Sequence, residues 1–225
     1  MCIGRNTEND KFEFDNLLLE NSKEEVVLGV TIDNKLTFDS HIKSICRKAG
    51  QKLGALLRIT NYLNSSQKKL IFSGMIKSQF SYCPLIWMFS SRKSNNLINR
   101  IHERSIRIVS SDNESNFENL LEKNKEITIH QRNLQILMIE VFKIINGYAP
   151  PIMDNFFIFR ENTHNLRNFQ IILNENKKTV RYGSETISYR TPLLWANLPE
   201  EYKLANSLGE FKSKIKTWKC DTCVC

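Results

Sequence analysis

The sequence predicts a mainly α-helical protein that begins with two short β-strands and ends in a small mixed α/β segment. Three observations support this fold class. Apolar residues recur at the spacing of helices between about residues 39 and 145, alternating segments precede this region, and helical periodicity fades after Pro151. We therefore divide the chain into residues 1–37, 38–150 and 151–225.

The N-terminal part contains two strand-forming segments, residues 11–15 and 25–32, joined by a polar loop. Gly29 breaks the second segment, and Asp33 ends it in an Asp-Asn-Lys turn. Two strands do not form a stable sheet alone, so we expect this part to be the edge of a larger sheet. The apolar residues expected to be poorly covered at this edge are Val26, Leu28, Val30 and Ile32.

The first helix is expected to begin with Asp39 or Ser40 as its N-cap and to carry one apolar stripe. Cations flank this stripe on both sides. Lys43, Arg47 and Arg58 lie on one side, and Lys48 and Lys52 lie on the other.

A second helix should begin after Asn64, because Gln67 three residues later completes a capping box. Pro84 lacks an amide hydrogen and clashes with the preceding turn. The second helix should therefore kink or end near Cys83.

A third helix is expected over about residues 95–110. It carries Arg100, Arg104 and Arg107, whose i, i+4, i+7 spacing keeps the three side chains on one face. Further helices are expected at about residues 115–122, 128–146 and 207–218, and short strands at residues 169–173, 179–182 and 186–189.

Lys and Arg total 32 against 24 Asp and Glu, which gives a formal net charge of +8. This excess favours a polyanionic partner such as nucleic acid, although a basic protein without such a partner has the same balance. The six cysteines suit a reducing compartment better than a disulfide framework. Because no segment resembles a signal peptide or a membrane span, we expect an intracellular protein of the nucleus or cytoplasm that is not secreted.

No arrangement of residues in the sequence indicates catalysis. Two-metal nucleotidyl transfer needs paired carboxylates, and the acids here are scattered, so Asp33 is better explained as a turn residue. There is no glycine-rich phosphate loop, and His41, His102 and His130 are expected at surface or cap positions on helices. We therefore expect no catalytic residue, no cofactor and no enzymatic activity of this chain.

Cys220, Cys223 and Cys225 form the one cluster with the spacing of metal ligands. A tetrahedral zinc site requires four ligands, and no fourth Cys or His lies nearby in the sequence. Exposed thiols are therefore the favoured interpretation, and a metal site is the alternative if the natural chain continues beyond Cys225.

The basic rows are the stronger functional signal. Cations on several helices, with aromatic residues between them, suit a surface that follows a phosphate backbone and stacks bases. The simpler interpretation is that the cations are solvated and the aromatic residues are buried. The candidate nucleic-acid-binding residues are Lys43, Arg47, Lys48, Lys52, Arg100, Arg104 and Arg107, and the candidate stacking residues are Tyr62, Tyr82, Trp87, Phe89, Tyr182, Tyr189 and Trp195.

Four blocks occur in order along the chain: LGVTIDNKLTFDSHI at 28–42, SQFSYCPLIWMFSSR at 78–92, NRIHERSIRIV at 99–109, and YGSETISYRTPLLWANLPEEYK at 182–203, followed by SLGEFKSKIKTWK. Together they closely resemble the C-terminal part of reverse transcriptases from jockey-like non-LTR retrotransposons of the LINE type. The resemblance covers most of the chain, and it is specific because several separate blocks agree.

In that family the palm of a hand-shaped polymerase carries the catalytic aspartates and its Mg, and the thumb holds the template and primer duplex. The resemblance implies that the Leu28 to Asp33 block marks the end of the palm, and that residues 38–150 form a helical thumb-like bundle behind a two-strand β remnant. The double-aspartate strand, the fingers and the endonuclease domain are missing from this sequence. We expect a truncated C-terminal piece of an RNA-directed DNA polymerase with residual, non-specific nucleic-acid binding.

The expected partner is RNA or an RNA/DNA duplex, bound weakly. The alternative is a helical scaffold or protein-interaction module without a nucleic-acid role. Such a module would self-associate or bind a protein through the exposed palm edge. No membrane partner is expected.

Overall fold

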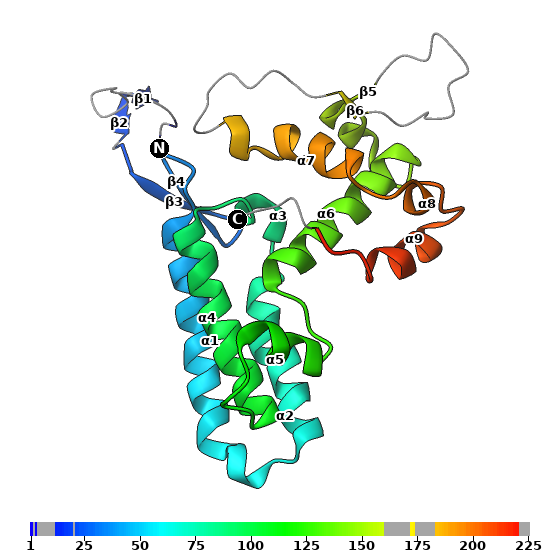
Figure 1. The fold of residues 1–225 in the computed structure, drawn as a ribbon. Coiled ribbons are helices and arrows are strands. Elements are labelled where there is room, and N and C mark those ends of the chain that lie inside the picture. Colours follow the sequence, from blue (N-terminus) through cyan, green and yellow to red (C-terminus); the bar gives the residue numbers. More distant parts are fainter. Residues whose placement is uncertain (2, 4–11, 20, 160–171, 174–182, 221–225) are drawn as a thin grey trace. The chain divides into compact units, whose positions relative to one another are not determined.

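The computed structural model describes residues 1, 3, 12–19, 21–159, 172–173 and 183–220. The chain is mainly helical, as the sequence predicts, with small antiparallel sheets of two strands (Figure 1). Packing divides it into two compact units, Met1–Ile129 and His130–Cys225. The division at residues 37 and 150 that the sequence suggests stays a prediction. Among the described residues, no helix combines the length and the apolar character needed to cross a membrane.

Two β-hairpins precede the first helix. Strand β1 (Phe12–Phe14) pairs with β2 (Leu17–Leu19), and β3 (Glu24–Val27) pairs with β4 (Val30–Asp33), each in antiparallel orientation. Strand formation within residues 11–15 is therefore confirmed. Each hairpin forms its own two-stranded sheet.

The strand-forming segment over residues 25–32 is broken at Gly29, as predicted, but its two halves pair with each other as a hairpin, which was not predicted from the sequence. Leu28 and Gly29 have φ angles of 48° and 80° and form the two-residue turn between β3 and β4. Both central positions of such a turn need positive φ, which glycine adopts freely and leucine does not. The Tyr82 hydroxyl donates a hydrogen bond to the Leu28 carbonyl oxygen (2.6 Å), and this contact stabilises the turn.

The first helix, α1 (Asp39–Ile59), is confirmed over the predicted range. Its N-cap position is Phe38, in the left-handed conformation, and the prediction of Asp39 or Ser40 is wrong. The Asp33 carboxylate accounts for the difference. It accepts a hydrogen bond from the Phe38 amide (2.7 Å) and so holds the backbone immediately before the helix.

The two strands of the second hairpin differ in how well they are covered. Val26 and Leu28 are 66% and 85% exposed, as expected for a poorly covered edge. The expectation is wrong for Val30, which is 2% exposed, and Ile32 is half-buried. Contact between β4 and α1 covers these two residues, whereas β3 lies on the outer side of the hairpin.

Helix α2 (Ser65–Ile71) begins at the predicted capping box. The Gln67 amide donates to Asn64 Oδ1 (2.9 Å), and the Asn64 amide donates to Gln67 Oε1 (3.0 Å). The helical run continues as a π-helical turn over Phe72–Ile76 and a 3-10 turn over Lys77–Phe80.

This run ends before Pro84, as predicted. Cys83 adopts the left-handed conformation (φ 43°), and Pro84 opens the short helix α3 (Pro84–Trp87). Proline fits the first turn of a helix because an amide hydrogen there would have no partner within the helix. Trp87 is buried, and its indole N–H donates to the Tyr82 carbonyl oxygen (3.2 Å).

The next two predicted helices are also confirmed. Helix α4 (Arg92–Ser110) begins slightly earlier than expected, because the Ser91 hydroxyl caps it by accepting a hydrogen bond from the Ser94 amide (3.3 Å). Helix α5 (Phe117–Lys123) is capped by the side chain of Asn116.

The core of the first unit is shared by α1, the α2 run, α3, α4 and α5. Each fully buried Leu or Ile side chain contributes about 1.5–3 kcal/mol relative to an exposed one. Core side chains that are at most 2% exposed include Ile42, Ala49, Leu56, Ile76, Trp87, Ile98 and Leu120.

The second unit is built on α6 (Ile129–Ile145), which confirms the predicted helix that ends before Gly147. A 3-10 turn (Pro151–Phe156), strands β5 (Ile158–Phe159) and β6 (Ile172–Leu173), and helices α7 (Ile187–Ala196), α8 (Glu200–Lys203) and α9 (Leu208–Ile215) follow.

Helices α6 and α9 are joined by stacking and by amide hydrogen bonds. The rings of Phe142 and Phe211 stack with their centroids 4.3 Å apart. Gln131 and Gln135 both donate side-chain hydrogen bonds to the Trp218 carbonyl oxygen (2.8 and 3.1 Å). These contacts fix the end of the last predicted helix.

The prediction of a strand at residues 186–189 is wrong, because this segment begins helix α7. Thr191, Leu194 and Trp195 are buried at the three- and four-residue spacing of a helix. β6 covers part of the strand predicted at 169–173. The rest of that strand and the strand predicted at 179–182 lie outside the described residues.

Candidate nucleic-acid interface

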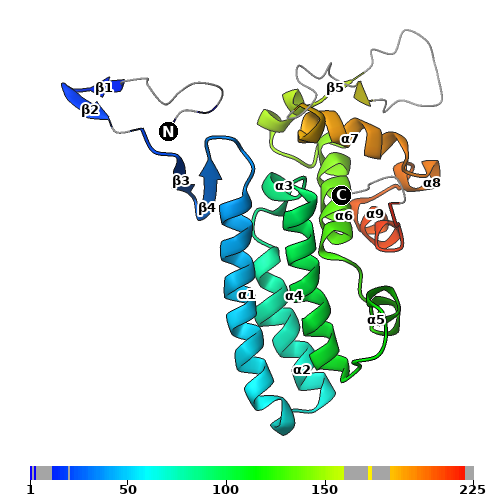
Figure 2. The same ribbon diagram turned by 60° about the vertical axis from the view of Figure 1, so that its left-hand side comes forward.

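Helices α1 and α4 run parallel and side by side along the first unit, as Figures 1 and 2 both show. At their N-terminal ends the Ser94 hydroxyl donates to the Asp39 carboxylate (2.5 Å). Farther along, Gly50 of α1 faces Ile101 of α4, because a Cβ on Gly50 would lie in ordinary van der Waals contact, 3.8 Å from Ile101 Cδ1. The line of contact between α1 and α4 is called the seam below.

Cations of both helices lie beside this seam on its solvent side. Arg47 comes three residues before Gly50 and Arg104 three residues after Ile101, so at about 100° per residue both are next to the line of contact. Lys43 and Arg100 are exposed on the same side. The structure therefore brings together four of the predicted residues from two separate rows.

Two further exposed cations share this side and were not among the predicted site residues. The sequence places Arg58 on the same line of α1 as Arg47, and Lys93 on the same line of α4 as Arg100 and Arg104. Helical spacing alone could have found both. The basic face is defined as Lys43, Arg47, Arg58, Lys93, Arg100 and Arg104.

The other three predicted residues are placed differently. Lys48 and Lys52 lie on the flank of α1 away from the seam, and Lys52 is half-buried. Arg107 is half-buried, forms an ion pair with Glu103 (Nη2 to Oε1, 2.5 Å) and donates to the Asp112 carbonyl oxygen (3.4 Å). The charge of Arg107 is thus largely balanced within the protein.

The stretch of sequence that contains most of the basic face has no acidic residue. From residue 40 to residue 102 the sequence contains eleven Lys and Arg and no Asp or Glu. The only acid of α1 is Asp39, which accepts the Ser94 hydrogen bond, and the only acid of α4 is Glu103, which is paired with Arg107. Within the described chain, neither Arg100 nor Arg104 forms an ion pair. The field at this face is therefore strongly positive.

The candidate stacking residues divide by burial. Trp87, Phe89 and Trp195 are buried, so the stacking role predicted for them is wrong, because their rings fill the cores. Tyr82 is 53% exposed, but its hydroxyl is bound to the β3–β4 turn. Tyr62 is 87% exposed. Of the remaining two candidates, Tyr189 is half-buried and Tyr182 lies outside the described residues.

Asp33 is a turn residue, as predicted. Its carboxylate accepts hydrogen bonds from the amides of Lys35 (3.0 Å), Thr37 (3.1 Å) and Phe38 (2.7 Å), and from the Thr37 hydroxyl (3.1 Å). Partial burial raises the pKa of this carboxyl, but the four hydrogen bonds outweigh burial, and the net pKa is lowered. Asp33 therefore connects β4 to α1 and has no neighbouring carboxylate for catalysis among its contacts.

Two histidines are buried, and the prediction of surface or cap positions for them is wrong. His41 is 3% exposed, lies beside Trp87 and accepts a hydrogen bond from the Thr31 amide at Nδ1 (3.3 Å). Burial, with a smaller effect from Lys48, lowers the pKa of His41. His102 is 1% exposed and stacks on Phe72. Both imidazoles therefore serve as core residues, although helical periodicity places them among polar neighbours in sequence.

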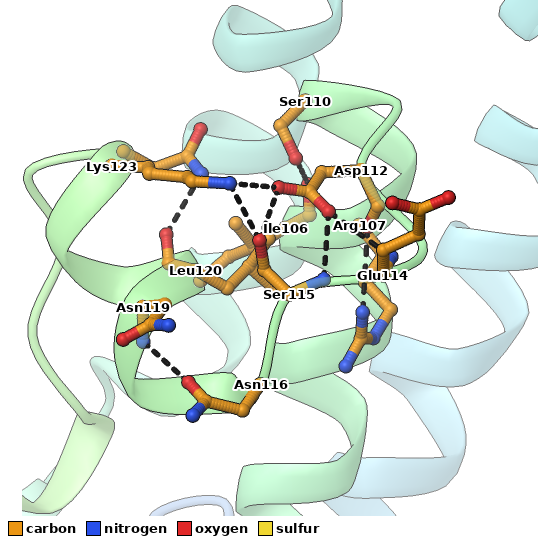
Figure 3. A network of polar contacts seen from close by, with 11 residues as sticks. Ile106, Arg107, Ser110, Asp112, Glu114, Ser115, Asn116, Asn119, Leu120 and Lys123 are labelled. Atoms are coloured by element: carbon orange, nitrogen blue, oxygen red, sulfur yellow. Dashed lines mark hydrogen bonds and ion pairs between the residues drawn. The ribbon is translucent and has the colours of Figure 1, made fainter.

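A polar network connects the end of α4 with α5, as Figure 3 shows. The Asp112 carboxylate accepts hydrogen bonds from the amides of Glu114 (3.1 Å) and Ser115 (3.0 Å), from the Ser115 hydroxyl (2.7 Å) and from Lys123 Nζ (3.0 Å). The Ser115 contacts lower the pKa of Asp112 most. The network fixes the turn after α4.

The predicted cysteine cluster is described only in part. Cys220 is half-buried, and its amide donates to Gln131 Oε1 (3.1 Å). Cys223 and Cys225 lie outside the described residues. Within the part of the chain that the structure describes, no group of three or more His, Cys, Asp or Glu side chains could hold a metal ion. The metal site stays a hypothesis from the sequence.

Comparison of the chain with protein-family models, with curated proteins and with solved structures found no match. The resemblance to non-LTR reverse transcriptases therefore rests on the four sequence blocks alone.

Proposed function

We propose that this chain binds RNA or DNA non-specifically through the basic face of α1 and α4. The observation that carries the proposal is the convergence of six exposed cations from two parallel helices, five of them in a stretch of the sequence, residues 40–102, that has no acid. Lys and Arg side chains that neutralise phosphates supply most of the free energy of non-specific nucleic-acid binding.

The dimensions of the basic face suit a phosphate backbone. Helix α1 has 21 residues, which correspond to a length of about 31 Å. Lys43 and Arg58 are separated by about 22 Å along this axis, so cations can contact several successive phosphates. Six contacts would give a slope of log affinity against log salt of about −5 for a duplex.

The sequence blocks support a more specific origin for this surface. By their resemblance, the chain is the thumb-containing C-terminal piece of a non-LTR retrotransposon reverse transcriptase, and α1 and α4 belong to the thumb. In this proposal the residues present here hold nucleic acid and do not polymerise it, because the family places its catalytic aspartates and Mg in the palm upstream of the Leu28 to Asp33 block.

Binding of the purified chain to a fluorescent RNA/DNA hybrid, measured by anisotropy at low salt, tests the proposal. The double variant Arg100→Glu/Arg104→Glu should weaken binding by about tenfold or more, because it replaces two favourable charges with two repulsive ones. The matched control is Lys212→Glu on α9 with Lys216→Glu at its C-cap, which changes the net charge equally at two exposed lysines of the second unit.

The control should lose much less affinity than the Arg variant. Equal losses in both variants would indicate that net charge alone is responsible. Absence of binding by the unmodified chain at low salt would contradict the proposal.

Exposure of the second hairpin favours one alternative function, a protein-interaction module. Val26, Val27 and Leu28 are 66%, 50% and 85% exposed, and one edge of β3 has no partner strand among the described residues. Exposed strand edges with apolar side chains bind other strands. Light scattering distinguishes this alternative: self-association that Val26→Lys abolishes would favour it, and a monomer without dye-binding apolar surface would count against it.

A further inference from the structure

The turn between α1 and α2 presents one aromatic ring to solvent. Tyr62 is 87% exposed, more than any other large hydrophobic side chain among the described residues. It ends the 3-10 turn Thr60–Tyr62, directly before the capping box of α2. An exposed ring at such a position has a large apolar area that water does not solvate favourably.

The backbone on both sides of Tyr62 is fixed. The Leu63 amide donates to the Thr60 carbonyl oxygen (3.3 Å), and the Leu63 side chain packs against the core of the first unit. The capping box between Asn64 and Gln67 fixes the next turn. The backbone of Tyr62 is therefore held at one place on the surface, and within the described residues its side chain makes no ring contact, hydrogen bond or ion pair.

Cations of the basic face lead to this turn and continue beyond it. Lys43, Arg47 and Arg58 follow one line of α1, and Arg58 is four residues before Tyr62. Lys69 is exposed on α2 after the turn. A phosphate backbone that follows the basic face along α1 would therefore reach the ring at the end of the helix.

We propose that Tyr62 stacks on an unpaired nucleobase at the end of a strand held by the basic face. This inference rests on the proposed function. The ligand is a duplex with a single-stranded overhang: phosphates bind the cations, and the first unpaired base covers the ring. Stacking on an aromatic side chain contributes free energy with little sequence preference, since every base has a π-face.

The chemistry around the ring favours a base over a lipid bilayer. Asn61, Asn64 and Ser65 are exposed polar neighbours, whereas a membrane-inserting tip needs a continuous apolar surface. Leu57 and Ile59 are each 45% exposed, but the polar Thr60 and Asn61 stand between them and Tyr62 in the sequence. Anionic vesicles nevertheless enter the experiment as a competing ligand.

The experiment compares a blunt duplex with the same duplex carrying a short 3′ overhang that contains 2-aminopurine. Anisotropy gives the affinity, and quenching of 2-aminopurine reports stacking. Tyr62→Ala should weaken binding of the overhang duplex by about tenfold and remove the quenching, but leave the blunt duplex unaffected. Tyr62→Phe, which keeps the ring, should behave like the unmodified chain.

The matched control is Tyr148→Ala, because Tyr148 is 57% exposed in the second unit and should affect neither duplex. If the chain binds the blunt duplex but Tyr62→Ala does not change its affinity for the overhang duplex, the stacking role alone is overturned. Absence of binding to either duplex would overturn the proposed function together with it. Binding to phosphatidylserine vesicles that depends on Tyr62, without 2-aminopurine quenching, would assign the ring to lipid instead.

Discussion

The Ser94 hydroxyl at the start of α4 donates a hydrogen bond to the Asp39 carboxylate at the start of α1, with 2.5 Å between the two oxygen atoms. This contact joins residues that are 55 positions apart and sets the two helices side by side in parallel. It also binds the single acid of α1. The hydrogen bond thus joins the N-terminal ends of the two helices that carry the basic face.

The Asp33 turn should stabilise the first unit. Replacing Asp33 by Ala removes four hydrogen bonds to a carboxylate, and we expect the free energy of unfolding to fall by about 2–3 kcal/mol. Chemical denaturation monitored by circular dichroism measures this change. Glu25→Ala on the exposed strand β3 is a suitable control. If both variants lower the free energy of unfolding by the same small amount, the stabilising role of the Asp33 turn is contradicted.

Asp33 should also make stability depend on acidic pH. Its folded-state pKa is lowered from the ordinary value of 3.8, so its contribution is present above about pH 4 and is lost as the pH falls through the folded-state pKa. The unmodified chain should therefore lose more thermal stability between about pH 5 and pH 3 than Asp33→Asn does. If the melting temperatures of the two proteins fall equally over this pH range, the lowered pKa of Asp33 is contradicted.

The buried imidazole of His41 should act in a different pH window. Because its folded-state pKa lies below the ordinary value of 6.5, the unfolded chain takes up a proton first as the pH falls. The contribution of the neutral His41 to the stability of the fold is therefore fully present above about pH 7 and decreases below pH 6.5. Thermal melts of the unmodified chain and of His41→Gln at neutral and mildly acidic pH measure this pH dependence. We expect the melting temperature of the variant to change less between the two pH values.

The thiol of Cys46 should be inert in the folded protein. Cys46 is 4% exposed, and burial raises its pKa to about 12, so the reactive thiolate is scarce. Peptide mapping after maleimide treatment should find Cys46 unlabelled in the native chain and labelled in denaturant. Native labelling of Cys46 as fast as that of the half-buried Cys220 would show that this part of α1 opens.

The capping box at the start of α2 should have a measurable effect on stability. Asn64→Ala removes the side-chain acceptor of the Gln67 amide hydrogen bond but keeps the backbone amide that donates to Gln67 Oε1, with an expected cost of about 1 kcal/mol in the free energy of unfolding. Asn64→Asp retains a side-chain acceptor and should recover most of the loss. A neutral effect of Asn64→Ala would mean that packing alone fixes the turn after Tyr62.

Local sequence signals predicted most of the helices. The capping box of Asn64 and Gln67 and the break at Pro84 act over a few residues, so they are visible without the fold. The break at Gly29 is visible in the sequence, but the reversal of the chain there was missed, because a tight turn also needs Leu28 in the left-handed conformation, which is not expected of leucine. Burial of His41 depends on contacts with Trp87 and Thr31, which no periodicity reveals.

The candidate site could be predicted only in its components. The sequence placed Arg47 and Arg104 in separate rows, and only the parallel packing of α1 and α4 shows that these rows share one face. The sequence placed Lys48 on the flank of the helix opposite Arg47, but it could not show which flank borders α4, or that Arg107 pairs with Glu103 instead of extending into solvent. Both facts depend on rotamers and on which side of α1 the neighbouring helix covers.

The most direct test of the account is the salt dependence of binding to an RNA/DNA hybrid by the unmodified chain and by Arg47→Gln/Arg100→Gln/Arg104→Gln. The three residues belong to the basic face. Glutamine removes their charges, preserves the helices and introduces no repulsion of the phosphates. We predict a slope of log affinity against log salt of about −5 for the unmodified chain, reduced in magnitude by about 3 in the variant. Identical slopes for the two proteins would contradict nucleic-acid binding at this face.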